Sequence, residues 1–130
     1  MKLISLETAE LAKEKGYNIP TIFYFIGNKS EPQEEEAEKG PYNWNERAGF
    51  SCPTQSNLQE WLRNVHKLHI MVEPDKSSKE DLVVWFSNVI TLKVYDTNYK
   101  NFYQLTGIHF ETTYEKALEH ALQSALKQLT

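Results

Sequence analysis

The sequence predicts an α+β domain, in which about three helices cover an antiparallel or mixed sheet of four to six strands. The 130 residues are 40% hydrophobic and 12% aromatic, which suits one folded domain with its own core and argues against disorder. Apolar residues recur at helical spacing in three segments, and short β-branched or aromatic runs lie between them. Because several strands follow one another, in the order α-β-(β)-α-β-β-β-α, an α+β class is favoured over regular α/β alternation.

The first predicted helix is short and is followed by a strand. Ser5 is the expected N-cap, and Gly16 stands where a helix commonly ends in a left-handed residue. Residues 21–26 are β-branched or aromatic and predict a strand that ends at Gly27. Since both of its faces are apolar, we expect this strand in the centre of a sheet, or covered on both sides.

Most of the negative charge belongs to one segment. Residues 28–41 hold five acidic and two basic residues, and the remaining 116 residues hold 13 acids and 12 bases. We expect this stretch to be a mobile acidic surface loop within a single domain of residues 1–130, because like charges repel and stay solvated. The alternative is an acidic contact for a basic partner or a cation. Residues 42–50 are ambiguous and could return as a short strand beside residues 21–26.

The second predicted helix opens at Thr54, the expected N-cap. Its apolar stripe has the spacing i, i+3, i+4, i+7 and consists of Leu58, Trp61, Leu62 and Val65. Residues 68–72 predict the strand that follows. Together these segments begin the second half of the domain.

Two further strands are predicted at residues 82–86 and 89–95, joined by the two-residue turn Ser87-Asn88. Because that turn lacks glycine, one long or bent strand is the alternative. Residues 96–107 predict a loop, and residues 107–110 a short edge strand.

The last helix follows an expected capping box, in which Thr112 caps the helix and Glu115 reaches back. Its apolar stripe recurs every three or four residues through Tyr114, Leu118, Ala121, Ala125 and Leu129. Polar residues, Glu119 and Gln123 among them, are expected to face water.

Two weak candidates for chemistry are Cys52 and the pair His66/His69. Cys52 precedes a helix N-terminus, where the dipole favours a thiolate, but a base would have to come from tertiary contacts, so a small buried cysteine is expected. His66 and His69 have the i, i+3 spacing that can chelate a metal on one helix. Leu68 and Ile70 indicate that the chain already turns into a strand there, which separates the rings. We therefore predict no metal and no cofactor.

Nucleotide chemistry through a glycine-rich loop is excluded, since neither GxGxxG nor GxxxxGK[ST] occurs. Residues 93–103 interleave lysines with aromatics, and such side chains can stack on bases or sugars and meet phosphates. Most of these aromatics are expected to cap the edge of the core. The exposed remainder is the predicted ligand or partner surface: Tyr95, Tyr99, Lys100 and Tyr103.

A cytoplasmic protein without membrane contact is expected. No apolar run approaches the roughly 18 residues of a membrane span, and the first residues do not resemble a signal peptide. The single cysteine fits a reducing compartment. The oligomeric state stays open; an uncovered apolar face, or an unpaired edge at residues 21–26, would favour a dimer.

Several stretches carry a resemblance to other proteins. They are Pro53-Thr54-Gln55-Ser56, Leu58-Gln59, Trp61-Leu62-Arg63, His66, His69-Ile70, Tyr114-Glu115, Ala117-Leu118-Glu119 and Ala125-Leu126, with the opening Leu3-Ile4-Ser5-Leu6-Glu7-Thr8-Ala9. In these residues the chain resembles small uncharacterised proteins of phages and prophage-like mobile elements in gut Bacteroides-type bacteria. The resemblance implies a bacterial cytosolic setting and a mobile-element origin, and it implies no activity.

The expected function is that of a non-enzymatic accessory protein whose partner is another protein. Nucleic-acid binding is the first alternative, because the order α-β-β-β-α over residues 54–129 parallels the double-stranded-RNA-binding fold, although topology alone does not imply function. The near-neutral body does not favour it. A small enzyme that uses Cys52, or a metal at His66/His69, is the second alternative.

Overall fold

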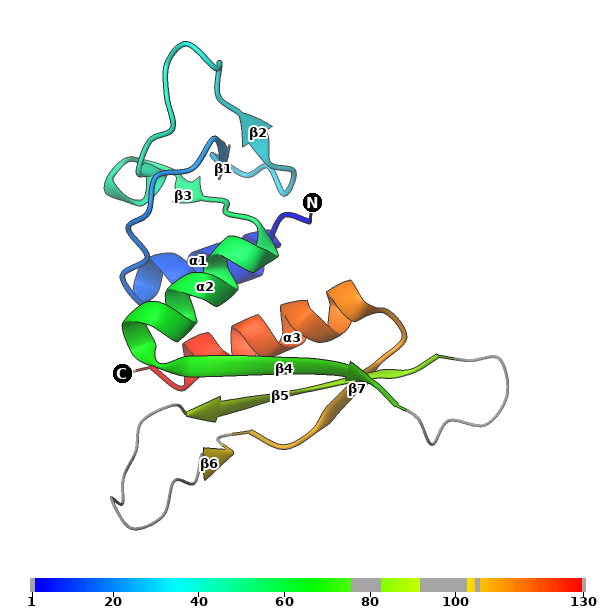
Figure 1. Cartoon of the computed structure of the whole chain (residues 1–130). Coiled ribbons are helices and arrows are strands. Elements are labelled where there is room, and N and C mark those ends of the chain that lie inside the picture. Colours follow the sequence, from blue (N-terminus) through cyan, green and yellow to red (C-terminus); the bar gives the residue numbers. More distant parts are fainter. Residues whose placement is uncertain (1, 76–82, 92–102, 105, 130) are drawn as a thin grey trace.

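The computed structural model describes residues 2–75, 83–91, 103–104 and 106–129. Its helices are α1 (Leu6–Glu14), α2 (Gln55–His66) and α3 (Tyr114–Lys127), with a 3₁₀ helix η1 at Trp44–Glu46. Its strands are β1 (Phe23–Phe25), β2 (Gln33–Glu34), β3 (Phe50–Ser51), β4 (Leu68–Pro74), β5 (Trp85–Thr91), β6 (Tyr103–Gln104) and β7 (His109–Glu111). The α+β prediction is confirmed, and the element order is close to the expected one (Figure 1).

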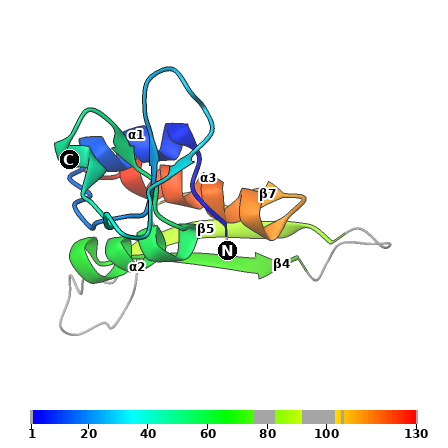
Figure 2. The same ribbon diagram turned by 90° about the horizontal axis from the view of Figure 1, so that it is seen from above.

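The strands form two separate antiparallel sheets. In the smaller, N-terminal sheet the order is β2-β1-β3, and in the C-terminal sheet β5 pairs with β4 on one side and with β6 and β7 on the other. The helices lie between the two sheets (Figure 1): α1 contacts β3, whereas α2 and α3 contact the C-terminal sheet. The view from above separates α1 from α2, which overlap in the first view (Figure 2).

One hydrophobic cluster joins these layers. It contains residues of α1, β1, α2, β4, β5 and α3, and its fully buried members include Phe25, Leu58, Leu62, Val89 and Leu122. Val65, expected in the apolar stripe of α2, is 57% exposed. The buried part of that stripe therefore ends at Leu62.

Each α-helix begins at a hydroxyl side chain. Ser5, Thr54 and Thr113 are the N-caps, and each hydroxyl oxygen accepts a hydrogen bond from the backbone N–H three residues later. Gly16 follows α1 with φ +90°, as expected of a glycine that ends a helix. The predicted capping box is wrong by one residue: because Thr113 is the cap, Glu115 occupies the second helical position and does not complete the box.

The two strands predicted at 82–86 and 89–95 are a single strand in the described part of the chain. Ser87 and Asn88 lie within β5, where Ser87 pairs with Val72 and Asn88 with Met71. Without a glycine to adopt positive φ, these residues continue the strand rather than turn. Residue 82 and residues 92–95 lie outside the described residues. The predicted edge strand is β7, which begins two residues later than expected.

The acidic segment is not loop throughout. Gln33 and Glu34 form β2, which pairs antiparallel with Tyr24 and Phe23 of β1. The ambiguous stretch before α2 contains η1 and then β3, which pairs with β1 on its other side. The short returning strand is therefore present, and β1 is central as expected, although it spans three residues instead of six.

Candidate interaction surface

The C-terminal sheet has one covered and one open face. Side chains alternate between the two faces of a strand. On the covered face Leu68, Ile70, Ser87, Val89 and Thr91 are buried, and α2 and α3 pack against this sheet. Figure 1 shows both helices on the same side, and within the described ranges no element covers the opposite side.

Seven side chains make up the open face, arranged in cross-strand rows. The first row holds Glu73, Phe86 and Phe110, the second Met71 and Asn88, and the third His69 and Ile90. Phe110 is 53% exposed, and its ring centroid lies 6.3 Å from that of Phe86. The exposed Ile108 directly precedes β7. Adjacent exposed aromatic and aliphatic side chains on an uncovered sheet are typical of a protein-binding surface.

The polar groups of the open face have distinct places. His69 and Glu73 stand near opposite ends of β4, and Asn88 lies between Phe86 and Ile90 on β5. The Oδ1 atom of Asn88 is buried and has no hydrogen-bond partner among the described residues. A buried amide oxygen normally has a partner, so this orientation of the amide leaves an unsatisfied atom, which a bound molecule reaches only after the Asn88 side chain turns outwards.

The predicted aromatic surface falls mostly outside the described residues. Tyr95, Tyr99 and Lys100 belong to residues 92–102, which the structure does not describe. Tyr103 lies in β6, where its backbone pairs with Thr91 of β5. The assignment of these four residues to a ligand surface stays a prediction. Sequence reasoning missed the open face itself: Ile70, Met71 and Val72 are all apolar, so residues 69–73 show no alternation that separates the two faces.

Cys52 is not placed for nucleophilic chemistry. Its side chain is 1% exposed, and its Sγ atom donates a hydrogen bond to the carbonyl oxygen of Ile4 at 3.5 Å. Burial, and secondarily the carboxylate of Glu119, raise the pKa of the thiol to about 12. Because the thiolate is the nucleophile, this environment keeps the sulfur inert and argues against a Cys-dependent enzyme.

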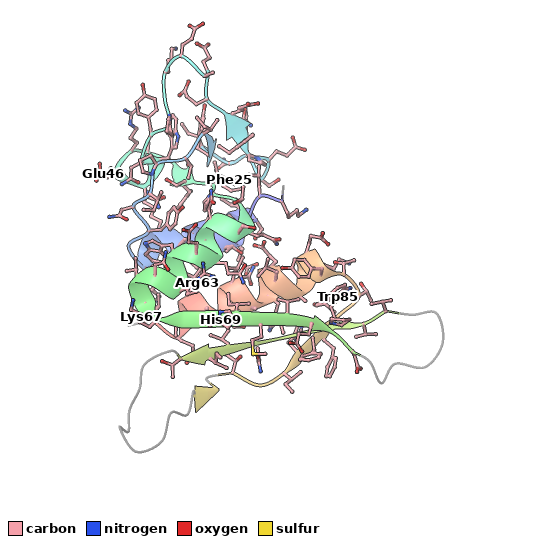
Figure 3. All side chains as sticks on the ribbon, viewed as in Figure 1. Phe25, Glu46, Arg63, Lys67, His69 and Trp85 are labelled. Carbon is pink, nitrogen blue, oxygen red and sulfur yellow. The ribbon has the colours of Figure 1, made fainter. Side chains whose placement is uncertain are left out.

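The pair His66/His69 is divided by the end of α2. Lys67 adopts a left-handed conformation with φ 58°, so the helix stops and β4 begins at once (Figure 3). His66 packs edge-on against Trp61, with ring centroids 4.6 Å apart, whereas His69 belongs to the open face. In the part of the chain that the structure describes, no group of three or more His, Cys, Asp or Glu residues could hold a metal ion.

Glu119 joins all three helices. Its Oε2 atom accepts hydrogen bonds from the backbone N–H and the hydroxyl of Ser5, both at 3.0 Å, and from the hydroxyl of Thr8. Its Oε1 atom accepts one from Nε2 of Gln55 at 2.9 Å. The expectation that Glu119 and Gln123 face water is therefore wrong: both are half-buried, and Gln123 donates to Thr8. These partners are more than 60 positions distant in sequence, so no local pattern reveals them.

A groove of about 1130 Å³ opens beside this network. Its lining includes Lys2, Phe25, Gln55, Lys116 and Glu119. The Glu119 carboxylate already accepts four hydrogen bonds from the protein. The carboxylate therefore links α3 to the N-termini of α1 and α2, where a negative charge is favourable. We assign Glu119 a structural role.

A second missed contact joins β7 to α3. The rings of His109 and His120 stack with centroids 3.4 Å apart and an interplanar angle of 10°. Nε2 of His109 lies 2.9 Å from Oε1 of Glu111. The residue is exposed, but partial desolvation of its ring, and secondarily the nearby His109, lower the pKa of His120 below its usual value. Two protonated rings in this stack would repel each other, so the contact favours neutral His120.

Stability should therefore depend on pH through His120. Since its pKa is lower in the folded state, the unfolded state binds the proton first as the pH falls, and the free energy of unfolding decreases through the region at and below about pH 6.5. Urea unfolding at about pH 7.5 and about pH 5.5 measures this loss. In His120→Gln the loss should be smaller; an equal loss in variant and wild type would contradict the assignment.

Comparison with known proteins finds no family model, no curated protein and no solved structure that matches this chain. The resemblance to phage and prophage-like proteins thus stays a prediction. Within the described residues, no helix combines the length and the apolar character that crossing a membrane requires.

Proposed function

We propose that this chain is a non-enzymatic protein-interaction module that binds its partner through the open face of the C-terminal sheet. The observation that supports this most strongly is the pair Phe86 and Phe110, which lie directly opposite each other on adjacent strands, on the sheet face that no described element covers. An exposed apolar patch costs solvation free energy in the isolated chain, and binding recovers it.

The surroundings of the other candidate groups support a non-enzymatic role. The thiol of Cys52 is buried and protonated, and the Glu119 carboxylate is engaged by Ser5, Thr8 and Gln55. On the resemblance stated above, we place the module in the bacterial cytoplasm as an accessory protein of a phage or mobile element.

A displayed peptide library tests the binding surface. Peptides selected on the wild-type chain should lose at least about tenfold in affinity for Phe110→Glu, because binding would desolvate the introduced carboxylate. Val65→Glu is the matched control, since Val65 is equally exposed on α2, away from the open face. Binding is measured at protein concentrations at which light scattering finds only monomer. Peptides that bind Phe110→Glu as well as wild type would refute the proposal.

Nucleic-acid binding is the second candidate, favoured by one observation. Between α2 and α3 the described residues form β4, β5, β6 and β7, and this order matches the α-β-β-β-α order of double-stranded-RNA-binding domains when the two-residue β6 is set aside. The exposed charges on these helices are mixed, however: Glu60, Arg63 and Lys67 on and after α2, with Glu115 and Lys116 on α3. Binding to a duplex RNA that weakens steeply with salt would support this candidate, and absence of binding at low salt would dismiss it.

A further inference from the structure

We propose that the partner on the open face is a second copy of this chain, and that two C-terminal sheets pack face to face about a two-fold axis. This inference rests on the proposed function and names its partner. The axis lies midway between the C-terminal sheets of the two copies and is perpendicular to their strands. It runs along the second row of each open face, Met71 and Asn88. Packed sheets of this kind stand about 10 Å apart and bury their facing side chains.

This axis makes the open face complementary to itself. With this axis, β4 of one copy lies over β4 of the other and β5 lies over β5, and the facing strands run in opposite directions. The first row of one copy therefore faces the third row of the other. His69 then faces Glu73 of the second copy, where the imidazole N–H can donate to the carboxylate. Phe86 faces Ile90, an apolar contact. Because the symmetry is two-fold, both contacts occur twice, and the interface closes as a dimer.

Asn88 stands nearest the axis and meets its own counterpart. Its Oδ1 atom lacks a hydrogen-bond partner among the residues that the structure describes. That atom is buried in the single chain, so the two amides meet after each Asn88 side chain turns towards the axis. Each oxygen then accepts a hydrogen bond from the N–H₂ group of the other Asn88. A buried amide pair of this kind fixes the register of the interface, as a buried Asn does in coiled coils.

Two other dimers fit the same surfaces less well. A two-fold axis along the strands would place Glu73 over the β7 side of the sheet, next to Phe110, where a carboxylate is desolvated without a partner. A dimer in which the free edge of β4 pairs with β4 of a second copy is hindered, because this edge lacks one free carbonyl and one N–H group. Gln59 Nε2 already donates to the carbonyl of Ile70 at 3.4 Å, and Pro74 has no N–H to offer.

A pair of opposite charge changes tests the arrangement. In His69→Glu two carboxylates face each other twice in the homodimer, and in Glu73→Lys the imidazole loses its acceptor. Each variant alone should dimerise at least about tenfold more weakly than wild type. Mixed together, they should form a heterodimer, because the carboxylate introduced by His69→Glu meets the ammonium introduced by Glu73→Lys, while the unchanged Glu73 and His69 still meet each other. Arg63→Glu, a charge reversal on α2, is the matched control.

Light scattering after size exclusion gives the mass of each sample. Wild type and Arg63→Glu should approach twice the 15.2 kDa of the chain, the single variants should shift towards monomer, and the mixture should return to dimer. Recovery in the mixture also shows that both variants are folded. A wild type that is monomeric at every concentration, or a mixture that stays monomeric, overturns the homodimer. If the homodimer is refuted but Phe110→Glu still weakens peptide binding, the proposed function stands. If peptides bind Phe110→Glu as well as wild type, the proposed function is refuted, whether the chain is a monomer or a dimer.

Discussion

Glu119→Ala should lower the free energy of unfolding by about 3 kcal/mol, since hydrogen bonds to a charged group each contribute about 1.5–3 kcal/mol and this carboxylate is only half-buried. The substitution removes the acceptor for Ser5, Thr8 and Gln55. The N-terminus of α1 would lose its hydrogen bonds to α3. The side chain of Gln55 would lose the carboxylate that accepts its hydrogen bond on that helix. Urea unfolding followed by far-UV circular dichroism measures the loss.

Two controls separate this tie from a general effect of changing α3. Glu119→Gln keeps the shape and one acceptor oxygen, so it should lose less than Glu119→Ala. Glu115→Ala removes an exposed carboxylate one turn earlier and should change stability by less than about 0.5 kcal/mol. Equal stability of Glu119→Ala and Glu115→Ala would show that the network around Glu119 contributes nothing.

Trp61→Ala should cost about 3–5 kcal/mol, the usual range for a large aromatic residue removed from a core. Trp61 is 6% exposed and belongs to the main hydrophobic cluster. Its ring meets that of Tyr17 edge-on at 5.2 Å, so it holds the segment after α1 against α2. Its other aromatic neighbour is His66, at 4.6 Å.

Thermal unfolding checks this prediction. The midpoint of Trp61→Ala should fall by about 10 °C or more for a chain of this size. Trp61→Phe retains an aromatic ring against Tyr17 and should lose about half as much or less. A Trp61→Ala protein with the melting midpoint of wild type would mean that the contact between Trp61 and Tyr17 contributes nothing to stability.

The helices can be predicted because their signals are local. Caps at Ser5 and Thr54 and the apolar stripe of α3 depend on neighbours within four residues, so the sequence alone identifies them. The predicted start of α3 is still wrong by one residue, because Thr112 and Thr113 both offer a hydroxyl. Only the backbone conformation decides which of the two becomes the cap.

The strands and the site depend on contacts across the chain. The local sequence predicts a turn at Ser87 and Asn88, whereas their pairing with β4 keeps them in a strand. Helical spacing predicts that Glu119 faces water, and residues from α1 and α2 surround it instead. The open face is a similar case: three consecutive apolar residues, Ile70, Met71 and Val72, hide the division of β4 into two faces. Which set of side chains the helices cover follows only from their packing.

The central claim is that the open face binds protein, and Met71 reports on it directly. The sequence holds two methionines, Met1 and Met71, so ¹³C-methyl labelling yields at most two signals, and Met71 lies in the second row of the face. Addition of a selected peptide, or an increase in protein concentration, should shift the Met71 methyl signal. Binding or dimerisation that leaves the Met71 signal unmoved would contradict the claim.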